Sequence, residues 1–154
     1  MHGIRFTSEF PVSRRAELER LVYFNANQHR VDGPLRAALH RYGAPSMVLG
    51  EKVIRFAVPK CPSVQTLYAL DESDAPGRLA AVAIYTREVE ETLSLIFLAL
   101  HEDYADGGAH GGRMLAQQVL ELLRANAART HGVRWLRLAY HPRDLRIAVR
   151  RPQP

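Results

Sequence analysis

A glycine-rich segment at residues 104–113 carries the pattern best suited to chemistry on a ligand. It reads Tyr-Ala-Asp-Gly-Gly-Ala-His-Gly-Gly-Arg and follows an apolar run that ends at Leu100. Glycine lets the main chain come close to a ligand, and the start of a helix offers unpaired N–H groups and the positive end of the helix dipole. The segment therefore predicts a phosphate-binding turn, with a purely structural tight turn as the alternative.

Three well-known phosphate and metal motifs are left incomplete in this part of the chain. A P-loop needs lysine and a hydroxyl residue where Arg113 and Met114 stand, which excludes a P-loop NTPase. A dinucleotide-binding turn needs a middle glycine where Ala109 stands. His101-Glu102 starts a zinc-protease motif that has no second histidine at the required spacing.

The elements around the turn form a predicted β-α-β unit. Residues 92–101 form a strand whose unbroken apolar run is typical of a central strand covered on both faces. Residues 113–129 form a helix that Gly132 is placed to end, and residues 133–140 form a second strand, parallel to the first. The helix residues predicted to face the core are Met114, Leu115, Val119, Leu122 and Leu123.

The rest of the chain predicts two helices and a run of strands. A strand at 4–10 precedes a helix from Ser13, its N-cap, to Asn25, and a second helix begins near Asp32 and ends at Gly43. Further strands are predicted at 53–58, 65–71, 79–87 and 145–149, the last at a sheet edge. We therefore expect one α/β (α+β) domain over residues 1–154, with a mixed, mostly antiparallel sheet flanked by helices.

The order and spacing of these features resemble the GNAT acyltransferase family over residues 4–140. The segment Leu100–Tyr104 resembles the signature at the end of the family's central strand, the glycine-rich segment resembles its cofactor loop, and Met114-Leu115 resembles the start of the next helix. The loop holds one residue more than the family pattern. The family's final helix and two strands do not fit into the fourteen residues that follow Tyr140.

The resemblance implies that the loop binds the pyrophosphate of acetyl-CoA or another acyl-CoA through main-chain N–H groups. The cofactor-binding residues that it implies in the loop are Asp106, Gly107, Gly108, Ala109, His110, Gly111, Gly112 and Arg113. For Arg113, whose charge would help, a solvated helix face is the alternative. The pantetheine arm is expected to pair with the backbone from Leu98 to Leu100, like an added strand.

Acyl transfer to an amine needs a base for the ammonium group and an acid for the departing thiolate. Glu102 and His101 follow the central strand, where a base would reach the acceptor. Tyr140, with His141 beside it, would replace the tyrosine acid that often lies on the family's final helix. The alternatives are a charge at a helix start for Glu102, a surface histidine for His101 and a core tyrosine for Tyr140.

Composition limits the classes of protein. With 47% hydrophobic and 24% charged residues the chain is an ordinary globular sequence, and its longest apolar run, Leu95–Leu100, is far short of the ~20 residues that cross a bilayer. The lone Cys61 and the absence of an apolar signal segment favour a cytoplasmic protein. The spacing of His101, Asp103 and His110 is unspecific, so we expect no metal site.

Three functions remain, in order of preference. The first is an N-acyltransferase acting on a primary amine of a small molecule or protein, and the second is a catalytically inactive acyl-CoA-binding or assembly protein of the same fold. The third is a nucleic-acid-binding module, because arginines dominate the chain after Glu121 and the net charge is +5, but no recognised motif accompanies them. The open edge at 145–149 predicts a homodimer joined through C-terminal strands.

Overall fold

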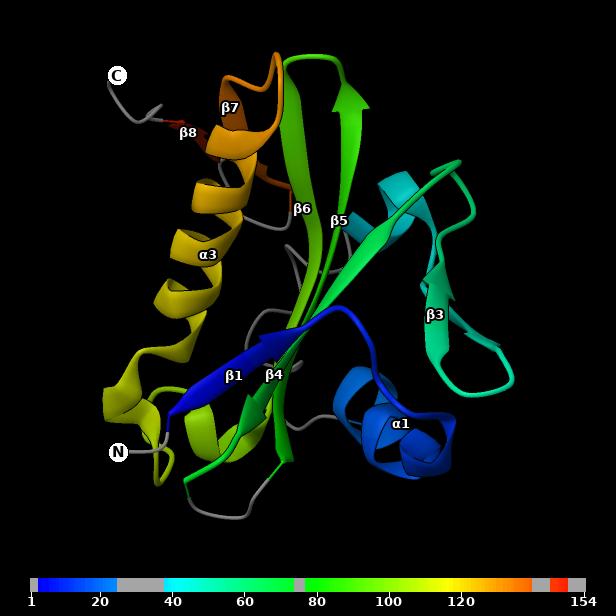
Figure 1. Ribbon diagram of the computed structural model, residues 1–154, viewed down its shortest axis with the longest axis vertical. Coiled ribbons are helices and arrows are strands. Elements are labelled where there is room, and N and C mark those ends of the chain that lie inside the picture. The colour runs from blue at the N-terminus through cyan, green and yellow to red at the C-terminus, as the bar shows by residue number, and fades with distance from the viewer. Residues whose placement is uncertain (1–2, 25–37, 74–76, 140–144, 150–154) are drawn as a thin grey trace.

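A six-stranded sheet forms the centre of the protein (Figure 1). The computed structural model describes residues 3–24, 38–73, 77–139 and 145–149. In their order across the sheet, the strands are β1 (Ile4–Thr7), β4 (Gln65–Asp71), β5 (Arg78–Val89), β6 (Thr92–Leu100), β7 (Trp135–Leu138) and β8 (Leu145–Ala148). All neighbours are antiparallel except β6 and β7, which are parallel. The predicted mixed, mostly antiparallel sheet with one parallel pair is confirmed.

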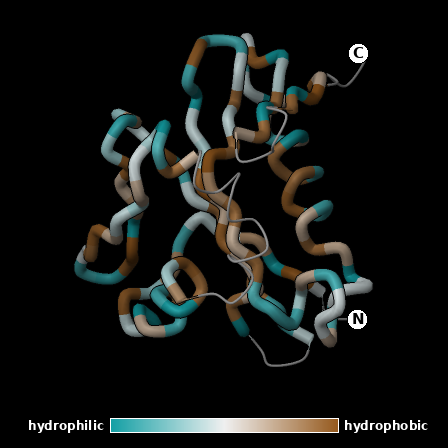
Figure 2. Tube along the Cα trace, turned by 180° about the vertical axis from the view of Figure 1, so that it is seen from behind, coloured by the Kyte–Doolittle hydropathy of each residue, from teal (hydrophilic) through white to brown (hydrophobic). Residues whose placement is uncertain are grey.

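Helices cover both faces of this sheet. On one face α1 (Arg15–Tyr23), the helical residues 38–42 and strand β3 (Ile54–Ala57) share one apolar cluster with the sheet. On the other face α3 (Leu115–Arg129) packs in a second cluster. Figure 1 shows the sheet between the two groups, and Figure 2 shows hydrophobic residues along its middle strands. Strand β3 also pairs with β2 (Ser46–Leu49) in a separate two-stranded sheet.

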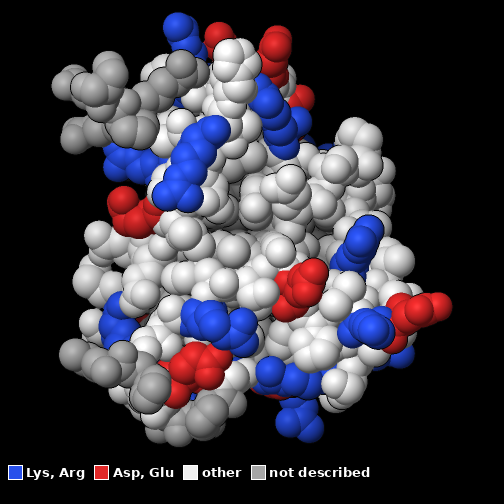
Figure 3. Space-filling view, in the orientation of Figure 1, with Lys and Arg blue, Asp and Glu red and all other residues white. Residues whose placement is uncertain are grey.

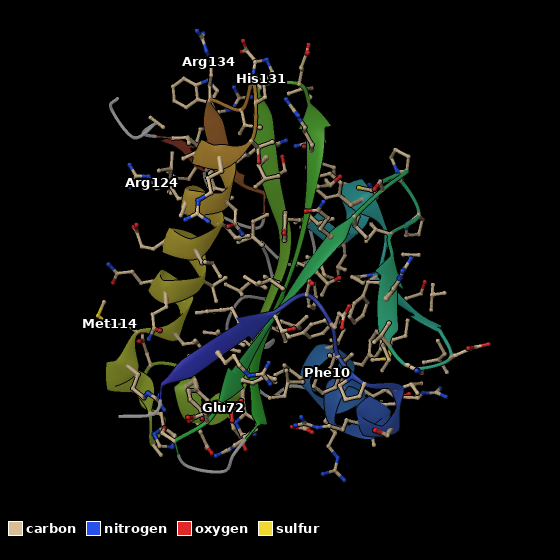
Figure 4. All side chains as sticks on the ribbon, viewed as in Figure 1. Phe10, Glu72, Met114, Arg124, His131 and Arg134 are labelled. Carbon is tan, nitrogen blue, oxygen red and sulfur yellow. The ribbon has the colours of Figure 1, made fainter. Side chains whose placement is uncertain are left out.

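The β-α-β unit is formed by β6, α3 and β7, as the sequence predicts. The residues of α3 that are buried recur at helical spacing and are Leu115, Val119, Leu123 and Ala127. The prediction that Met114 is buried is wrong, because its side chain is 60% exposed and points away from the sheet (Figure 4). Met114 has a left-handed conformation, with φ 52° and ψ 50°, so α3 begins only at the next residue.

The first helix differs from its prediction at its start. Ser13 lies in a 3₁₀ turn, Val12–Arg14, and α1 follows with Arg14 at the N-cap position and no side-chain cap. The predicted capping role of Ser13 is therefore wrong, and the predicted end at Asn25 lies outside the described residues. The second helix ends as predicted, since Gly43 has φ 89° and donates its N–H to the carbonyl of Leu39.

Several strand limits also differ from the prediction. The limits of β4 are confirmed, whereas β5 continues to Val89 and turns only at Glu90 and Glu91. Strand β2 was not predicted, because its side chains are mostly exposed and show no apolar alternation. Strand β7 is shorter than predicted, and Tyr140 lies outside the described residues. The predicted edge strand is confirmed as β8, the last strand of the sheet.

Candidate functional site

The charged residues nearest the glycine-rich segment come from three neighbouring strand ends. Strand β4 ends at Asp71, β5 begins at Arg78, and β6 leads into His101 and Glu102. Because β5 runs antiparallel to both neighbours, Arg78 lies opposite Asp71, and the N–H of His101 donates to the carbonyl of Ala80 at 2.8 Å. The sheet therefore gathers these side chains at one of its ends.

The glycine-rich segment folds as two short 3₁₀ turns, Glu102–Tyr104 and Gly111–Arg113, joined by a loop. The main-chain N–H groups that donate within it are Ala105 to Glu102 O (3.3 Å), Gly108 to Ala105 O (2.9 Å), His110 to Asp103 O (2.6 Å), Gly111 to Gly108 O (3.1 Å) and Arg113 to His110 O (3.1 Å). The N–H groups of Gly107, Ala109 and Gly112 have no acceptor in the part of the chain that the structure describes. Only part of the predicted amide set therefore remains available to a ligand.

The four glycines of the loop differ in what requires them. A side chain at Gly108 or Gly111 would overlap a main-chain oxygen of the loop itself, and Gly107 has φ 85°, which favours glycine. Gly112 has no left-handed φ and no neighbouring atom within 4 Å of a Cβ built on it. Loop geometry thus explains three glycines, and Gly112 is the one that it leaves unexplained.

A buried carboxylate ties the loop to the sheet. Asp71 is fully buried and accepts hydrogen bonds from the Tyr104 hydroxyl and from Nη1 of Arg113, the latter at 2.7 Å. Ser73 donates to the same carboxylate through its N–H at 2.9 Å and its Oγ at 2.6 Å. The Tyr104 ring stacks on His110 with 5.0 Å between ring centroids. Arg113 is therefore the partner of Asp71 and does not lie on a solvated helix face.

These contacts shift the pKa values of Asp71 and Tyr104 in opposite directions. Burial alone would raise the pKa of Asp71, but the hydrogen bonds from Ser73, Tyr104 and Arg113 outweigh burial and hold this pKa well below its usual range. Burial, followed by the hydrogen bond to Asp71 and its charge, raises the pKa of the Tyr104 hydroxyl. Asp71 thus stays ionised and Tyr104 stays protonated at neutral pH.

A second group of charges surrounds His101. Arg78 donates through Nη2 to Asp103, and the hydrogen bond from Arg78 is the main reason that the pKa of Asp103 is lowered. The N–H of Asp103 donates to Nδ1 of His101 at 3.2 Å, and Nη2 of Arg78 lies at a longer 3.4 Å from both ring nitrogens. The shorter bond from Asp103 favours the neutral tautomer with its proton on Nε2, in which His101 is a donor at that nitrogen. In this form His101 suits a phosphate or carbonyl oxygen better than it suits the role of a base.

His101 and Glu102 line a pocket of about 700 Å³ beside α1. Glu17 and Arg78 also line it, but Glu17 accepts hydrogen bonds from Arg14 and Arg78 pairs with Asp103. Glu102 is exposed, and its side chain has no hydrogen bond or ion pair within the described ranges. Its carboxylate is therefore available to a ligand in this pocket.

Strand β6 continues beyond the end of its parallel partner. The last β6–β7 pair is Leu95 with Leu138, so the described part of β7 does not reach the second half of β6. Because the N–H of His101 points to β5 and main-chain groups alternate along a strand, those of Leu98 and Leu100 point to the opposite edge. A register shift in the β5–β6 pairing lies next to Leu95. The edge predicted for the pantetheine arm is thus one with which the described part of β7 does not pair beyond Leu95.

The structure brings some predicted site residues together and leaves others apart. Glu102 and His101 lie side by side at the end of β6, and the loop residues 106–113 follow them, whereas Tyr140 lies outside the described residues. Sequence reasoning missed Asp71 and Arg78 because they are far from the loop along the chain. The one signal for Asp71 was a carboxylate at the end of a predicted apolar strand.

Comparison with protein-family models, with curated proteins and with solved structures gives no match to this chain. None of the helices in the described ranges is long and apolar enough to span a membrane. Among the same residues there is no cluster of three or more His, Cys, Asp or Glu side chains that could hold a metal ion. An account of function therefore depends on the geometry of the loop, of the β6 edge and of the pockets.

Proposed function

We propose that this chain is an N-acyltransferase that moves an acyl group from acyl-CoA to a primary amine. The observation that carries the proposal is the stretch of the β6 edge beyond Leu95, which leads from the glycine-rich loop into the sheet and with which the described part of β7 does not pair. Main-chain groups of Leu98 point to this edge, so the amide-containing arm of coenzyme A pairs with it as an added strand would.

The loop fits a phosphate through its main chain. The exposed residues Gly107, Ala109 and Gly112 offer N–H groups, and the first turn of α3 adds further N–H groups without intrahelical acceptors. Arg113 and Arg78 contribute less than their charges suggest, because Asp71 and Asp103 already neutralise them. Binding should therefore depend on main-chain contacts and on access to Gly112.

Two of the residues predicted for catalysis lie near the phosphates of a bound acyl-CoA and not near its thioester. Glu102 and His101 lie at the loop end of β6, beside the phosphates of an acyl-CoA bound in this way. Nε2–H of His101 would donate a hydrogen bond to a phosphate oxygen there. Tyr140 stays the predicted acid for the thiolate. Acetyl-CoA supplies the activated thioester, and the group that accepts the proton of the amine has to lie deeper along β6.

The two other functions predict different behaviour. An inactive acyl-CoA-binding protein would bind acetyl-CoA and transfer nothing. A nucleic-acid-binding module would need a continuous basic surface, but Arg137 is buried, and Figure 3 shows Lys and Arg interspersed with Asp and Glu over one face. A cytoplasmic homodimer stays a prediction, which the edge position of β8 supports.

Amine-dependent release of coenzyme A tests the proposal. Purified protein is incubated with acetyl-CoA and a panel of primary amines, free thiol is followed over time, and the products are identified by mass spectrometry. We expect thiol release only with certain amines, together with the matching acetamide. Thiol release that does not depend on an amine would indicate thioester hydrolysis and contradict the proposal, as would binding without any release.

A further inference from the structure

The length of the pantetheine arm fixes how far along β6 the reacting thioester lies. Between its phosphate and its sulfur the arm spans about 14 Å, the length of about four extended residues. With the phosphates at the loop and the arm along this edge of β6, the sulfur reaches the level of Ile96. Glu102 lies at the opposite end of that path, too far away to take a proton from an amine that attacks the thioester.

A cluster of polar side chains lies at the inner end of the same path. Ser94 pairs with Arg137 in the β6–β7 register, one step before the last pair. Glu88, at the end of β5, accepts at Oε2 from Ser94 Oγ (2.9 Å), Arg137 Nη1 (2.9 Å) and Tyr42 Oη (3.0 Å). Ser94 is fully buried and Arg137 is 6% exposed, so the carboxylate is held in a fixed position.

The other oxygen of Glu88 is less occupied. Oε1 has one contact within the described part of the chain, with Nη2 of Arg41 at a long 3.4 Å. Glu88 also lines a pocket of about 220 Å³ together with Tyr42, Thr86 and Cys61. Three donors thus fix one oxygen and leave the other available to a ligand in the pocket.

We propose that this pocket takes the acceptor amine and that Glu88 is the base that deprotonates its ammonium group. The inference rests on the proposed acyltransferase function. Proximity supports it, because Ser94 is two residues from Ile96, about 7 Å along the strand. The catalytic residue of the proton transfer is then Glu88, and Tyr42, Ser94 and Arg137 are positioning residues.

The charges around the pocket indicate the class of acceptor. Among the described residues that line it, Glu88 is the carboxylate, and Arg41, Lys60 and Arg87 are basic. The guanidinium of Arg87 donates to the carbonyls of Glu90 and His131, so the cations left to the pocket are Arg41 and Lys60. An ammonium group alone would be repelled by these two cations, whereas an acceptor that also carries a carboxylate or phosphate would pair that group with them and its ammonium group with Glu88. The volume suits a small molecule. The pocket therefore fits a small amine with an anionic group.

The transfer balances without any further reactant. Glu88 Oε1 takes one proton from the ammonium group, and the freed nitrogen lone pair forms a C–N bond to the thioester carbonyl carbon. The C–S bond breaks and coenzyme A leaves as a thiolate, while the nitrogen gives up its second proton, which reaches the thiolate through solvent or through the predicted acid Tyr140. The products are an amide and free coenzyme A, and Glu88 returns its proton to solvent.

Glutamine substitutions at three carboxylates test the inference. At saturating acetyl-CoA, with β-alanine, phosphoethanolamine and propylamine as acceptors, we expect Glu88→Gln to lower kcat at least about 100-fold. Its affinity for acetyl-CoA should stay near that of the wild type. Glu9→Gln, at an exposed carboxylate that lines neither pocket, should leave kcat unchanged. The two anionic acceptors should give a higher kcat/KM than propylamine. The ratio of kcat/KM for β-alanine to that for phosphoethanolamine distinguishes a carboxylate site from a phosphate site.

The outcomes separate this inference from the proposed function. Transfer by the wild type with an unchanged kcat in Glu88→Gln, or a 100-fold loss in Glu102→Gln instead, overturns the role of Glu88 and leaves the proposed function standing. Propylamine as the best acceptor overturns the acceptor class. No transfer by the wild type overturns both proposals. If Glu88→Gln does not fold, Glu88→Asp replaces it, because aspartate keeps the charge beside Arg137 but withdraws it from the pocket. An unchanged kcat in Glu88→Asp would equally contradict the role of Glu88 as the base.

Discussion

Replacing Gly112 with glutamate should abolish acetyl-CoA binding without disturbing the fold. Gly112 is exposed, needs no left-handed φ and has no atom within 4 Å of a Cβ built on it, so the backbone accepts a side chain. A carboxylate there would cover a free N–H group and repel the pyrophosphate, and two charges 4 Å apart near a protein surface repel by about 4 kcal/mol before salt screening. We expect the Kd for acetyl-CoA, measured by calorimetry, to rise at least about 30-fold.

The same position offers its own controls. Gly112→Lys introduces a side chain of similar length and opposite charge, so it should bind acetyl-CoA at least as tightly as the wild type. Gly112→Ala should bind nearly normally. Gly108 and Gly111 are unsuitable for this test because any side chain there would overlap the main chain. Equal affinities for Gly112→Glu and Gly112→Lys would show that the loop does not hold the phosphates.

Replacing Asp71 with alanine should produce the largest loss of stability. The change leaves the buried Tyr104 hydroxyl and the partly buried Arg113 guanidinium without their acceptor, and breaking such a pair costs about 3 kcal/mol. Urea unfolding at neutral pH measures this loss. Glu72→Ala is the matched control, because Glu72 pairs with Arg5 at the surface. This variant should lose less than about 1 kcal/mol of unfolding free energy. Similar losses in both variants would contradict the role of the buried cluster.

The effect of Asp71 should also depend on pH. Its pKa is lower in the folded protein than in the unfolded chain, so its ionised form stabilises the fold fully above the unfolded value, about pH 4. This stabilisation is lost as the pH falls from there toward the folded pKa. The difference in unfolding free energy between wild type and Asp71→Ala should therefore shrink below about pH 4. A difference that stays constant down to pH 3 would mean that the charge of Asp71 contributes nothing.

Local pattern was enough to predict most of the fold. The apolar run in β6, the periodic residues of α3 and the terminating Gly43 each depend on neighbours in sequence, and all three were predicted. Strand β2 was missed because its four residues are paired with β3 alone and are mostly exposed. The start of α3 was misplaced because nothing local indicates that Met114 adopts a left-handed conformation.

The site was predictable only where its residues are adjacent in the chain. The glycine-rich loop and Glu102 were singled out from their places next to the central strand, but the partners that hold the loop come from elsewhere. Asp71 and Arg113 are 42 residues apart, and Glu88 and Arg137 are 49 residues apart. Such pairs form only when strands assume their order in the sheet. Arg137, one of the arginines that suggested a nucleic-acid surface, is buried and has Glu88 as its partner.

Amide chemical shifts during titration with coenzyme A test the central claim most directly. In ¹⁵N-labelled protein, we expect the largest changes at the N–H groups of Gly107, Ala109 and Gly112 and at Leu98, on the edge of β6 with which the described part of β7 does not pair. The amides of Gly108 and Gly111, which already donate within the loop, should move less. A spectrum that stays unchanged, or changes confined to the arginine-bearing strands β7 and β8, would contradict the proposal that the loop and the β6 edge bind an acyl-CoA.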